Sequence, residues 1–572
     1  MNASDILLEV KNLSVAFDGR RVVDGINYTL QRGRTLGIVG ESGSGKSVST
    51  LALMGLLPKQ ATISGHAWLA DKATLDGDAA PTDLLTLTDD DFRDIRGRRI
   101  SMIFQEPMTS LNPVKHCGEQ VAEMLRLHEP VDHDEARRRT LDLFNEVLLP
   151  RPEKIYDSYP HEISGGQKQR VMIAMALICK PELIIADEPT TALDVTVQKT
   201  ILVLLRQLQQ RHNLSIIFIT HDLGVVAQIA DDVVVMYHGQ IVEQGPAATL
   251  LHQPQHPYTQ GLLACRPPAE GRPRRLPTVS DYMEGRSATA TPAAPTPTAD
   301  NASGNADRER PVLLSVRDLD VTYTTARNLW GRPRRQFQAL RGISFDVYRG
   351  ETLGLVGESG CGKTTLGRAI LQLVEHSSGS ISYEGQRLDT MSYSQLRQMR
   401  TKMQIIFQDP YSSLNPRMTV GQALMEPLLS HHRFDSHQQR HQHVITLMER
   451  VGLEPSWFDR YPHEFSGGQR QRICIARALV LEPELVICDE SVSALDVSVQ
   501  AQVLNLLNEL KETFHYTYIF ISHDLSVVHF ISDRIMVMRN GALVEMADAD
   551  ALFSHPTDPY TQNLLDAIPR ID

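Results

Sequence analysis

The sequence lacks long apolar runs. Within its 572 residues, no stretch approaches the roughly 18 to 20 consecutive apolar residues that a membrane-spanning helix needs. The first residues, MNASDILLEV, also lack the basic and then apolar layout of a secretory signal peptide. We therefore expect a soluble cytoplasmic protein that reaches a membrane only through a partner.

Cysteine is scarce, and positive charge is not in excess. The six cysteines are scattered and include no CxxC pair, so neither a disulfide framework nor a zinc site is predicted, and a reducing compartment fits best. The formal net charge of −12 argues against a protein that coats nucleic acid, because neutralising phosphates requires a surplus of Lys and Arg. The composition, 42% hydrophobic and 22% charged, is that of a globular chain, and its length indicates about three or four domains.

One unit is repeated along the chain. Three pairs of matching residues are each separated by 302 positions: Ser164 and Ser466, Asp187 and Asp489, and His221 and His523. Internal similarity at a fixed offset is typical of a duplicated structural unit. We predict a first unit over residues 5–265, a second over residues 312–572, and a linker at 266–311 between them.

The linker is rich in Pro, Ala, Thr and Gly, as in TATPAAPTPTADNASGNAD. Such a segment cannot bury enough apolar surface to offset the entropy lost on ordering, so we predict that it is disordered. About 45 flexible residues span roughly 35 to 40 Å, which lets the two units pack face to face within one chain. The second unit also carries an Arg-rich insertion, TTARNLWGRPRRQ, after Tyr323, which is either a solvated hairpin extension or an arm that binds phosphate or a partner.

Strand and helix patterns alternate in both units. The runs TLGIVG and TLGLVG, at residues 35–40 and 352–357, are short and apolar and end in Gly, as buried parallel strands do before a turn. PELIIAD and PELVICD indicate further buried strands. Strands that alternate with helices predict an α/β fold with a mainly parallel sheet in each unit.

Each unit contains a phosphate-binding loop. GESGSGKS, Gly40 to Ser47, and GESGCGKT, Gly357 to Thr364, both match GxxxxGK[ST] directly after an apolar strand. In such a loop, glycines let backbone N–H groups converge on phosphate oxygens at a helix N-terminus, the lysine reaches the β- and γ-phosphates, and the Ser or Thr hydroxyl ligates Mg²⁺. A glycine turn that binds nothing does not account for two matches in repeated contexts. The predicted nucleotide-binding residues are Gly40, Ser42, Gly43, Gly45, Lys46, Ser47, Gly357, Ser359, Gly360, Gly362, Lys363, Thr364 and Thr365.

Adjacent carboxylates end a later strand in each unit. LIIADE places Asp187 beside Glu188, and LVICDE places Asp489 beside Glu490. Downstream of a phosphate loop, the aspartate suits a Mg²⁺ site, and the glutamate suits polarising the water that attacks the γ-phosphate. An apolar strand that ends in Asp-Glu is weak evidence alone, and the upstream loop makes it specific.

Together, the ordered motifs resemble those of the ATP-binding cassette (ABC) ATPases. Besides the loops and carboxylates, each unit has SGGQ, a glutamine in IFQEP or IFQDP, an ALD motif (192–194 and 494–496) and a later histidine. More narrowly, SLNP, DVTVQ or DVSVQ, and the tails HPYTQGLLA and DPYTQNLLDA are similar to those of importers of the dipeptide, oligopeptide, glutathione and nickel branch. Some members of that branch fuse both cassettes in one chain.

The resemblance implies two P-loop NTPase cassettes, each a RecA-like, mainly parallel sheet core with an antiparallel β subdomain and a helical subdomain. It also implies that the cassettes pair head to tail within the chain, so that each ATP lies between one phosphate loop and the SGGQ of the other copy. The residues that the opposite copy adds are Ser466, Gly468 and Asp496 at the first site, and Ser164, Gly166 and Asp194 at the second. The residues with implied catalytic roles are Gln105, Glu188, His221, Gln408, Glu490 and His523. Those with implied roles around Mg²⁺ are Ser47, Gln105, Asp187, Thr364, Gln408 and Asp489.

Other positions complete or depart from the family pattern. Phe17 and Tyr323, at the ends of the first strands, match the aromatic residue that stacks on adenine in this family, although an aromatic there also suits a core. DESVSALD in copy two replaces DEPTTALD, and FSGGQ has Phe where Leu often leads, but neither changes a group that touches phosphate, so both sites are expected to hydrolyse ATP.

Only Cys265 occupies the region where some relatives carry an iron–sulfur cluster, so no cluster is predicted. The run HHRFDSHQQRHQH is expected to form a solvated helix rather than a metal site, although His437 and His441 have i,i+4 spacing.

The function that the resemblance implies is that of an ATPase which energises a membrane importer of peptides or peptide-like solutes, with ATP and Mg²⁺ as cofactors. The expected partners are two transmembrane permease subunits and, indirectly, an extracytoplasmic solute-binding protein, at the cytoplasmic face of the inner membrane. The cargo stays open between peptides, glutathione, a peptide antibiotic and nickel. The alternative is a tandem-cassette ATPase acting on ribosomes or nucleic acid, but such relatives carry a long charged helical linker or zinc-binding cysteine modules, which this sequence lacks. A nucleotide-gated scaffold without turnover is disfavoured because Glu188 and Glu490 are both present.

Overall fold

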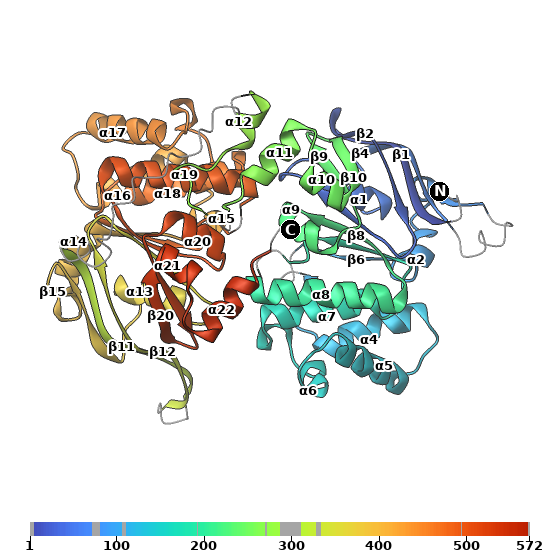
Figure 1. The fold of residues 1–572 in the computed structure, drawn as a ribbon, viewed down its shortest axis with the longest axis horizontal. Coiled ribbons are helices and arrows are strands. Elements are labelled where there is room, and N and C mark those ends of the chain that lie inside the picture. The colour runs from blue at the N-terminus through green and yellow to red at the C-terminus, as the bar shows by residue number, and fades with distance from the viewer. Residues whose placement is uncertain are drawn as a thin grey trace.

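The computed structural model describes residues 5–70, 80–105, 110–190, 193–268, 271–285, 310–327, 333–493 and 495–569. These residues form two cassettes of the same architecture that lie side by side along the long axis of the molecule (Figure 1). Positions 192 and 494 of the ALD motifs and residues 286–309 of the predicted linker lie outside the described residues. No helix among the residues described is long and apolar enough to cross a membrane.

A six-stranded sheet forms the core of the first cassette, in the order β10-β9-β3-β8-β7-β6. Its strands are β3 (Thr35–Val39), β6 (Ile100–Ile103), β7 (Leu183–Asp187), β8 (Ser215–Thr220), β9 (Asp232–Tyr237) and β10 (Gln240–Pro246). All neighbouring strands are parallel except the edge pair β9 and β10. Every residue of β3, β7 and β8 is buried, because the sheet is covered on both faces, and this burial explains the apolar runs seen in the sequence.

Two further layers cover this core. The antiparallel sheet, in the order β2-β1-β4-β5, contains β1 (Ile6–Phe17), β2 (Arg20–Gln31), β4 (Ala61–Leu69) and β5 (Thr82–Asp83). The helices are α1 (Lys46–Leu53), α2 (Phe92–Ile95), α4 (Cys117–His128), α5 (His133–Glu146), α6 (Pro152–Tyr156), α7 (Gly165–Leu177), α8 (Val195–His212) and α9 (Leu223–Ile229). Apolar residues of β1, β2 and α1 pack as one cluster, and those of α4 to α8 pack as another.

The second cassette repeats this plan. Its core sheet runs β16-β17-β18-β13-β19-β20 and contains β13 (Thr352–Val356), β16 (Met403–Ile406), β17 (Leu485–Asp489), β18 (Thr517–Ile521), β19 (Arg534–Arg539) and β20 (Ala542–Asp548). Its antiparallel sheet, in the order β12-β11-β14-β15, contains β11 (Val312–Arg327), β12 (Pro333–Tyr348), β14 (Ser378–Tyr383) and β15 (Gln386–Arg387). Its helices are α13 (Lys363–Ile370), α14 (Tyr393–Lys402), α15 (Pro410–Ser413), α16 (Val420–Ser430), α17 (His437–Arg450), α18 (Gly467–Leu479), α19 (Val497–Phe514) and α20 (Leu525–Ile531). The predicted α/β fold with one antiparallel and one helical layer per cassette is confirmed.

The structure shows where two segments that the sequence analysis singled out lie. The strands β11 and β12 pair as far as Arg327 and Pro333, so the described part of the Arg-rich insertion lengthens these two strands. Residues 328–332 of the insertion lie outside the described residues. The histidine-rich run leads into α17, where a helix was expected. Two of its histidines pack inward, because His443 Nε2 lies 3.0 Å from the Val480 carbonyl oxygen and the ring of His441 lies 4.6 Å from that of Phe458.

Each cassette ends in a helical tail. The tails contain α10 (Ala247–His252), α11 (Pro257–Ala264) and α12 (Val279–Met283) in the first cassette, and α21 (Ala549–Ser554) and α22 (Pro559–Asp566) in the second. Residues 271–285 fall inside the range expected to be a disordered linker, yet they are ordered, and α12 lies within them. The physical reason is that this segment does bury apolar side chains, since Leu276 is 0% and Val279 is 7% exposed.

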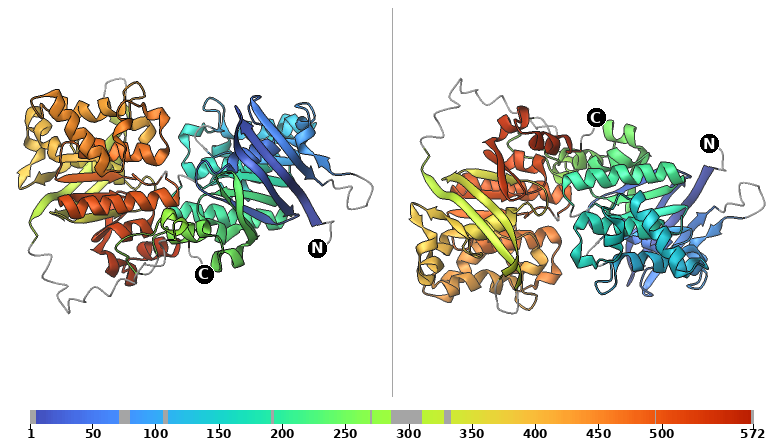
Figure 2. Two further views of the ribbon diagram at one scale, coloured as in Figure 1. Left: turned by 90° about the horizontal axis from the view of Figure 1, so that it is seen from above. Right: turned by 90° about the horizontal axis from the view of Figure 1, so that it is seen from below.

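The two cassettes share part of one apolar core. Residues of the first tail, including Tyr258, Leu262, Leu276 and Val279, pack in the same cluster as the core of the second cassette. Figure 1 places α11 and α12 beside α19, and both views of Figure 2 keep the first tail at the boundary between the cassettes.

Candidate functional site

Both phosphate loops connect a central strand to a helix. In the first cassette the loop joins β3 to α1, and in the second it joins β13 to α13. Gly45 and Gly362 are the N-caps of these helices, with φ of 96° and 106°, a region that favours glycine. A Cβ on Gly45 would lie 2.9 Å from the Val22 carbonyl oxygen, and one on Gly362 would lie 2.7 Å from that of Ala339. Glycine is therefore required at both positions to form the loop.

A buried lysine lies inside each loop. Lys46 Nζ donates to the carbonyl oxygens of Gly40 at 2.7 Å and Glu41 at 2.8 Å. Lys363 Nζ donates to those of Gly357 at 2.6 Å and Glu358 at 3.0 Å in the same way. Burial lowers the pKa of Lys46, although the nearby carboxylates oppose this shift. Each lysine is thus a desolvated cation surrounded by backbone groups, as binding a polyphosphate requires.

The hydroxyl that ends each loop is bonded to the first strand-end carboxylate. Ser47 Oγ donates to Asp187 Oδ1 at 3.0 Å, and Thr364 Oγ1 donates to Asp489 Oδ1 at 3.0 Å. Burial raises the pKa of Asp187 to about 6 and also raises that of Asp489. Hydroxyl and carboxylate oxygens are the ligands that Mg²⁺ prefers, so this donor set fits the ion.

Glu188 is placed between a glutamine and a histidine. Gln105 Nε2 donates to Glu188 Oε2 at 3.2 Å, and His221 Nδ1 lies 3.3 Å from the same oxygen. The Nδ1–Oε2 contact has the distance of an ion pair but not the angle of a hydrogen bond. Burial alone would lower the pKa of His221, but the carboxylates of Glu188, Asp496 and Asp222 outweigh it, and the net shift is upward.

Glu490 has the corresponding environment in the second cassette. Gln408 Nε2 donates to Glu490 Oε2 at 2.6 Å, and His523 Nδ1 lies 3.8 Å from it. Burial opposes the charged form of Glu490, but His523, Lys363 and Gln408 favour it and lower its pKa. Glu188 and Glu490 both have positive φ, 46° and 47°, a conformation that is uncommon for a non-glycine residue and is enriched at functional sites.

The phosphate loops also contact the opposite cassette. The backbone N–H of Ser42 donates to Asp496 Oδ2 at 2.7 Å, and that of Ser359 donates to Asp194 Oδ2 at 3.3 Å. Near the first of these contacts, the Ser498 hydroxyl donates to the Glu41 carboxylate. Each cassette therefore places the aspartate before its long helix, α19 or α8, against the phosphate loop of the other.

The SGGQ motifs begin helices α7 and α18. Ser164 and Ser466 are exposed N-caps whose hydroxyls accept from the backbone N–H three residues later. A Cβ on Gly166 would lie 2.8 Å from Val197, and one on Gly468 would lie 2.3 Å from Val499, so these glycines let α7 and α18 approach α8 and α19 closely. This packing role was not predicted from the sequence.

The remaining predicted residues lie around the loops. Phe17 is half-buried against the core of the first antiparallel sheet, whereas Tyr323 is 38% exposed. Gly43 and Gly360, at φ of 79° and 80°, have open space where a Cβ would be. Thr365 is half-buried in the first turn of α13.

Two tyrosines that sequence reasoning did not single out contact the loops. Tyr258 Oη accepts from the backbone N–H of Glu41 at 3.0 Å, and Tyr560 Oη accepts from that of Glu358 at 3.1 Å. Both belong to the tail motifs HPYTQ and DPYTQ and again differ by 302 positions, which is the signal that could have identified them.

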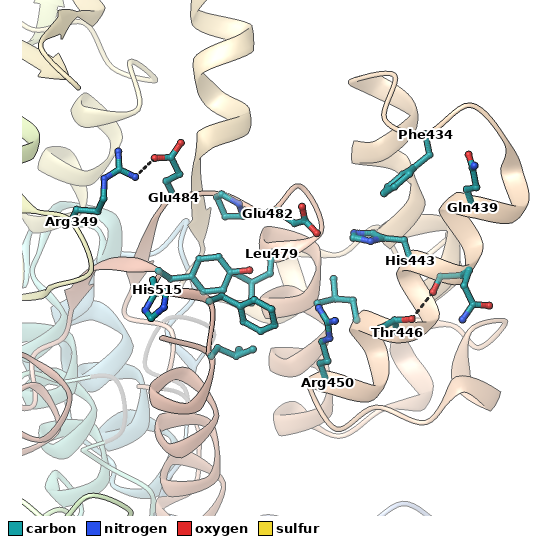
Figure 3. Close-up of a pocket in the computed structure, with 16 residues that line it drawn as sticks. Arg349, Phe434, Gln439, His443, Thr446, Arg450, Leu479, Glu482, Glu484 and His515 are labelled. Carbon is teal, nitrogen blue, oxygen red and sulfur yellow. Dashed lines mark hydrogen bonds and ion pairs between the residues drawn. The ribbon is translucent and has the colours of Figure 1, made fainter. Parts of the chain in front are cut away.

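Two cavities have different relations to these residues. One of about 530 Å³ borders the second site, because Thr364, Gln408 and Asp489 line it. Another, of about 800 Å³, contains none of the predicted site residues and lies between α17 and the ends of α18 and α19 (Figure 3). The guanidinium of Arg450 lies 5.1 Å from the ring centre of Phe514 there.

Comparison with known proteins gives consistent matches over the whole chain. The family described as "ABC transporter" matches residues 23–191 and 340–493, and "Oligopeptide/dipeptide transporter, C-terminal region" matches residues 242–291 and 544–572. A "Glutathione import ATP-binding protein GsiA" of Pectobacterium atrosepticum is 48% identical over 99% of this chain and 90% of its own length. Proteins with the same description from Escherichia coli (strain K12) and Salmonella typhimurium are also 48% identical, over 98% and 99% of this chain and 89% and 90% of their own lengths.

Proposed function

Because the chain belongs to the ABC transporter family, as a fused tandem ATPase of the peptide- and glutathione-importer branch, we propose that its two phosphate loops and strand-end carboxylates form two composite ATP sites at the interface of the cassettes. The chain is an ATPase whose hydrolysis is coupled to import. The ribosome- or nucleic-acid-directed alternative is not favoured, since the similarity to import ATPases extends over 99% of the chain.

The pairing of each loop with an aspartate of the opposite copy supports the composite sites. The hydrogen bonds from Ser42 to Asp496 and from Ser359 to Asp194 bring together parts that neither cassette has alone. At the first site, backbone N–H groups and Lys46 would bind the phosphates, and the second cassette would complete the site through Ser466 and Gly468. The second site would use Lys363 with Ser164 and Gly166.

Within each site, the residues divide the chemistry between them. Glu188 and Glu490 would orient and polarise the attacking water, while the contacts from Gln105, His221, Gln408 and His523 position the two carboxylates. Asp187 with Ser47, and Asp489 with Thr364, would hold Mg²⁺. Gln105 and Gln408 would contribute to the ion site, and Gln408 lines the same cavity as Thr364 and Asp489. The bound ion would neutralise charge that develops on the transferred phosphoryl group. Phe17 and Tyr323 would stack on the two adenines.

The proposed setting is the cytoplasmic face of the inner membrane, with peripheral attachment through two transmembrane permease subunits. An extracytoplasmic solute-binding protein would be an indirect partner that delivers the cargo to these subunits. We place the two cassettes at residues 5–265 and 312–572, with the tail of the first cassette continuing beyond residue 265 to include α12 (Val279–Met283). Glutathione is the favoured cargo within the peptide-like class, because the relatives that match over nearly the whole chain are described as glutathione import proteins.

Reconstituted transport tests this function. The chain would be purified with the permease subunits encoded beside it, placed in proteoliposomes, and supplied with the neighbouring solute-binding protein. We expect ATP-dependent glutathione uptake and stimulated ATPase activity, both lost in a Lys46→Ala/Lys363→Ala variant. ATPase activity that is stimulated by ribosomes or DNA instead, with no membrane partner recovered, would contradict the proposal.

A further inference from the structure

One face of α19 is bonded to the first cassette along its whole length. Ser498, Asn505 and Glu512 recur every seven residues, which is close to two helical turns, so they project from the same side. Ser498 donates to the Glu41 carboxylate of the first phosphate loop, and Arg274 Nη2 lies 3.0 Å from Glu512 Oε2. Between them, Asn505 bonds to the segment that lies between α11 and α12 of the first tail.

Asn505 and Leu276 form a buried pair of hydrogen bonds. Asn505 Nδ2 donates to the Leu276 carbonyl oxygen at 2.9 Å, and the Leu276 N–H donates back to Asn505 Oδ1 at 2.9 Å. Asn505 is 5% exposed and Leu276 is 0% exposed. Separating them would leave polar groups without partners in an apolar site, which is strongly unfavourable. We name residues 271–276 the strap; its Arg272 also donates to the Phe530 carbonyl oxygen, at 2.9 Å.

The matching face of α8 in the first cassette is different. The residues 302 positions earlier are Thr196, Val203 and Gln210. Within the described part of the chain, Thr196 Oγ1 is buried with no hydrogen-bond partner, and Val203 is 49% exposed. The second tail reaches α8 through an exposed hydrogen bond from Lys199 Nζ to the Asp566 carbonyl oxygen, at 2.8 Å.

The contact between loop and aspartate is also shorter at the first interface, the one that α19 helps to form, than at the second. The bond from Ser42 to Asp496 is 2.7 Å, whereas that from Ser359 to Asp194 is 3.3 Å. Asp496 directly precedes α19, so anchoring the middle and end of this rigid helix also fixes Asp496 against the first loop. Asp194 directly precedes α8, whose corresponding face has no strap among the described residues.

We propose that the strap and α19 form a latch that keeps the first interface, Ser42 with Asp496, closed through the ATPase cycle, so that the paired cassettes open at the second interface, Ser359 with Asp194. The latch rests on the proposed pairing of the cassettes around two ATPs. Its consequence is that the two ATP sites are unequal, because nucleotide enters and leaves mainly at the second loop.

Two covalent links on the full chain test the latch directly. Arg274→Cys with Glu512→Cys joins the strap to α19, and Lys199→Cys with Asp566→Cys joins the second tail to α8. Each pair is bridged with a flexible bismaleimide, the bridge is verified by peptide mass spectrometry, and ATPase activity is compared with that of the unbridged variant. The parent chain treated with the same reagent is the control for its six native cysteines.

We expect the strap bridge to leave ATPase activity within about twofold, and the second-tail bridge to lower it by about tenfold or more, since blocked opening limits turnover. Equal inhibition by both bridges, or inhibition by the strap bridge alone, would overturn the latch. Absence of ATPase activity in the parent chain would instead refute the proposed function.

A matched pair of substitutions supplies a readout that does not need turnover. Asn505→Val gives α19 the residue that α8 has at the corresponding position, Val203. Val203→Asn makes the reverse change in α8. In the parent chain, hydrogen–deuterium exchange at residues 271–276 is expected to be slow both with and without ATP. In Asn505→Val it rises about tenfold or more, and in Val203→Asn it stays unchanged. Exchange that becomes fast in the parent during ATP binding would overturn the latch, as would no change in Asn505→Val.

Discussion

The backbone N–H of Ser42 donates a 2.7 Å hydrogen bond to the carboxylate of Asp496, 454 positions further along the chain. The same loop is contacted from its own tail, because Tyr258 Oη accepts from the N–H of Glu41 at 3.0 Å. The first phosphate loop thus lies between the opposite cassette and its own tail. A movement of either element would change the position of the loop groups that we propose bind phosphate.

Removing the aspartates that cross the interface is expected to affect the two sites unequally. Asp496→Ala should lower ATPase activity by about tenfold, because a charge-assisted hydrogen bond is lost. Such a bond contributes about 1.5 to 3 kcal/mol, and the partial exposure of this one reduces its contribution toward the lower value. Asp194→Ala should have a smaller effect, since its bond to Ser359 is longer, 3.3 Å. Steady-state ATPase assays measure both, with the exposed Asp142→Ala on α5 as the control. A larger loss in Asp194→Ala would contradict the order given.

The loop hydroxyls are expected to set the requirement for Mg²⁺. Ser47→Ala with Thr364→Ala removes the oxygens that are bonded to Asp187 and Asp489. The Mg²⁺ concentration for half-maximal ATPase activity should rise by about tenfold, because each proposed ion site loses one oxygen ligand. In the exchange variant Ser47→Thr with Thr364→Ser, which keeps both hydroxyls, it should stay within about twofold. An unchanged Mg²⁺ requirement in the alanine variant would remove these residues from the ion site.

A partly buried ion pair between Asp533 and Lys511 makes the stability of the second cassette depend on pH. Asp533 Oδ2 accepts from Lys511 Nζ at 2.6 Å and from the N–H of Thr352 at 2.8 Å. Burial alone would raise the pKa of Asp533, but these partners outweigh it and the net shift is downward. Because the folded-state pKa is depressed, the stabilisation is present above the unfolded pKa of about 3.9 and is lost as the pH falls through the folded value.

Thermal unfolding of Asp533→Asn measures this contribution. The variant should melt a few degrees below the parent at pH 7, and the difference should shrink as the pH falls below about 4. Asp459→Asn, at an exposed acidic residue of the same cassette, is the control. A difference in melting temperature that stays constant with pH would contradict the role given to Asp533.

The sequence predicts the local motifs of the sites better than the contacts between residues that lie far apart along the chain. The phosphate loops, strand-end carboxylates and duplicated α/β fold follow from local motifs and from apolar periodicity, which short-range physics determines. The ordered conformation of residues 271–285 could not be predicted from the sequence, because this segment belongs to a range with the composition of a linker. Its Leu276 is held by Asn505, which lies 229 positions away along the chain. The contacts of Tyr258 and Tyr560 with the loops depend on how the tails fold back and were likewise not evident.

Glu188 and Glu490 are the residues that we propose carry out the hydrolytic step in the two ATP sites of this chain. The most direct measurement compares ATP binding and hydrolysis in a Glu188→Gln/Glu490→Gln variant with those of the parent. The change keeps the size of both side chains and removes the carboxylates that we propose polarise water, so we predict ATP affinity within about threefold of the parent and ATPase activity reduced by about 100-fold or more. ATPase activity equal to that of the parent would show that these two glutamates do not carry out the hydrolytic step.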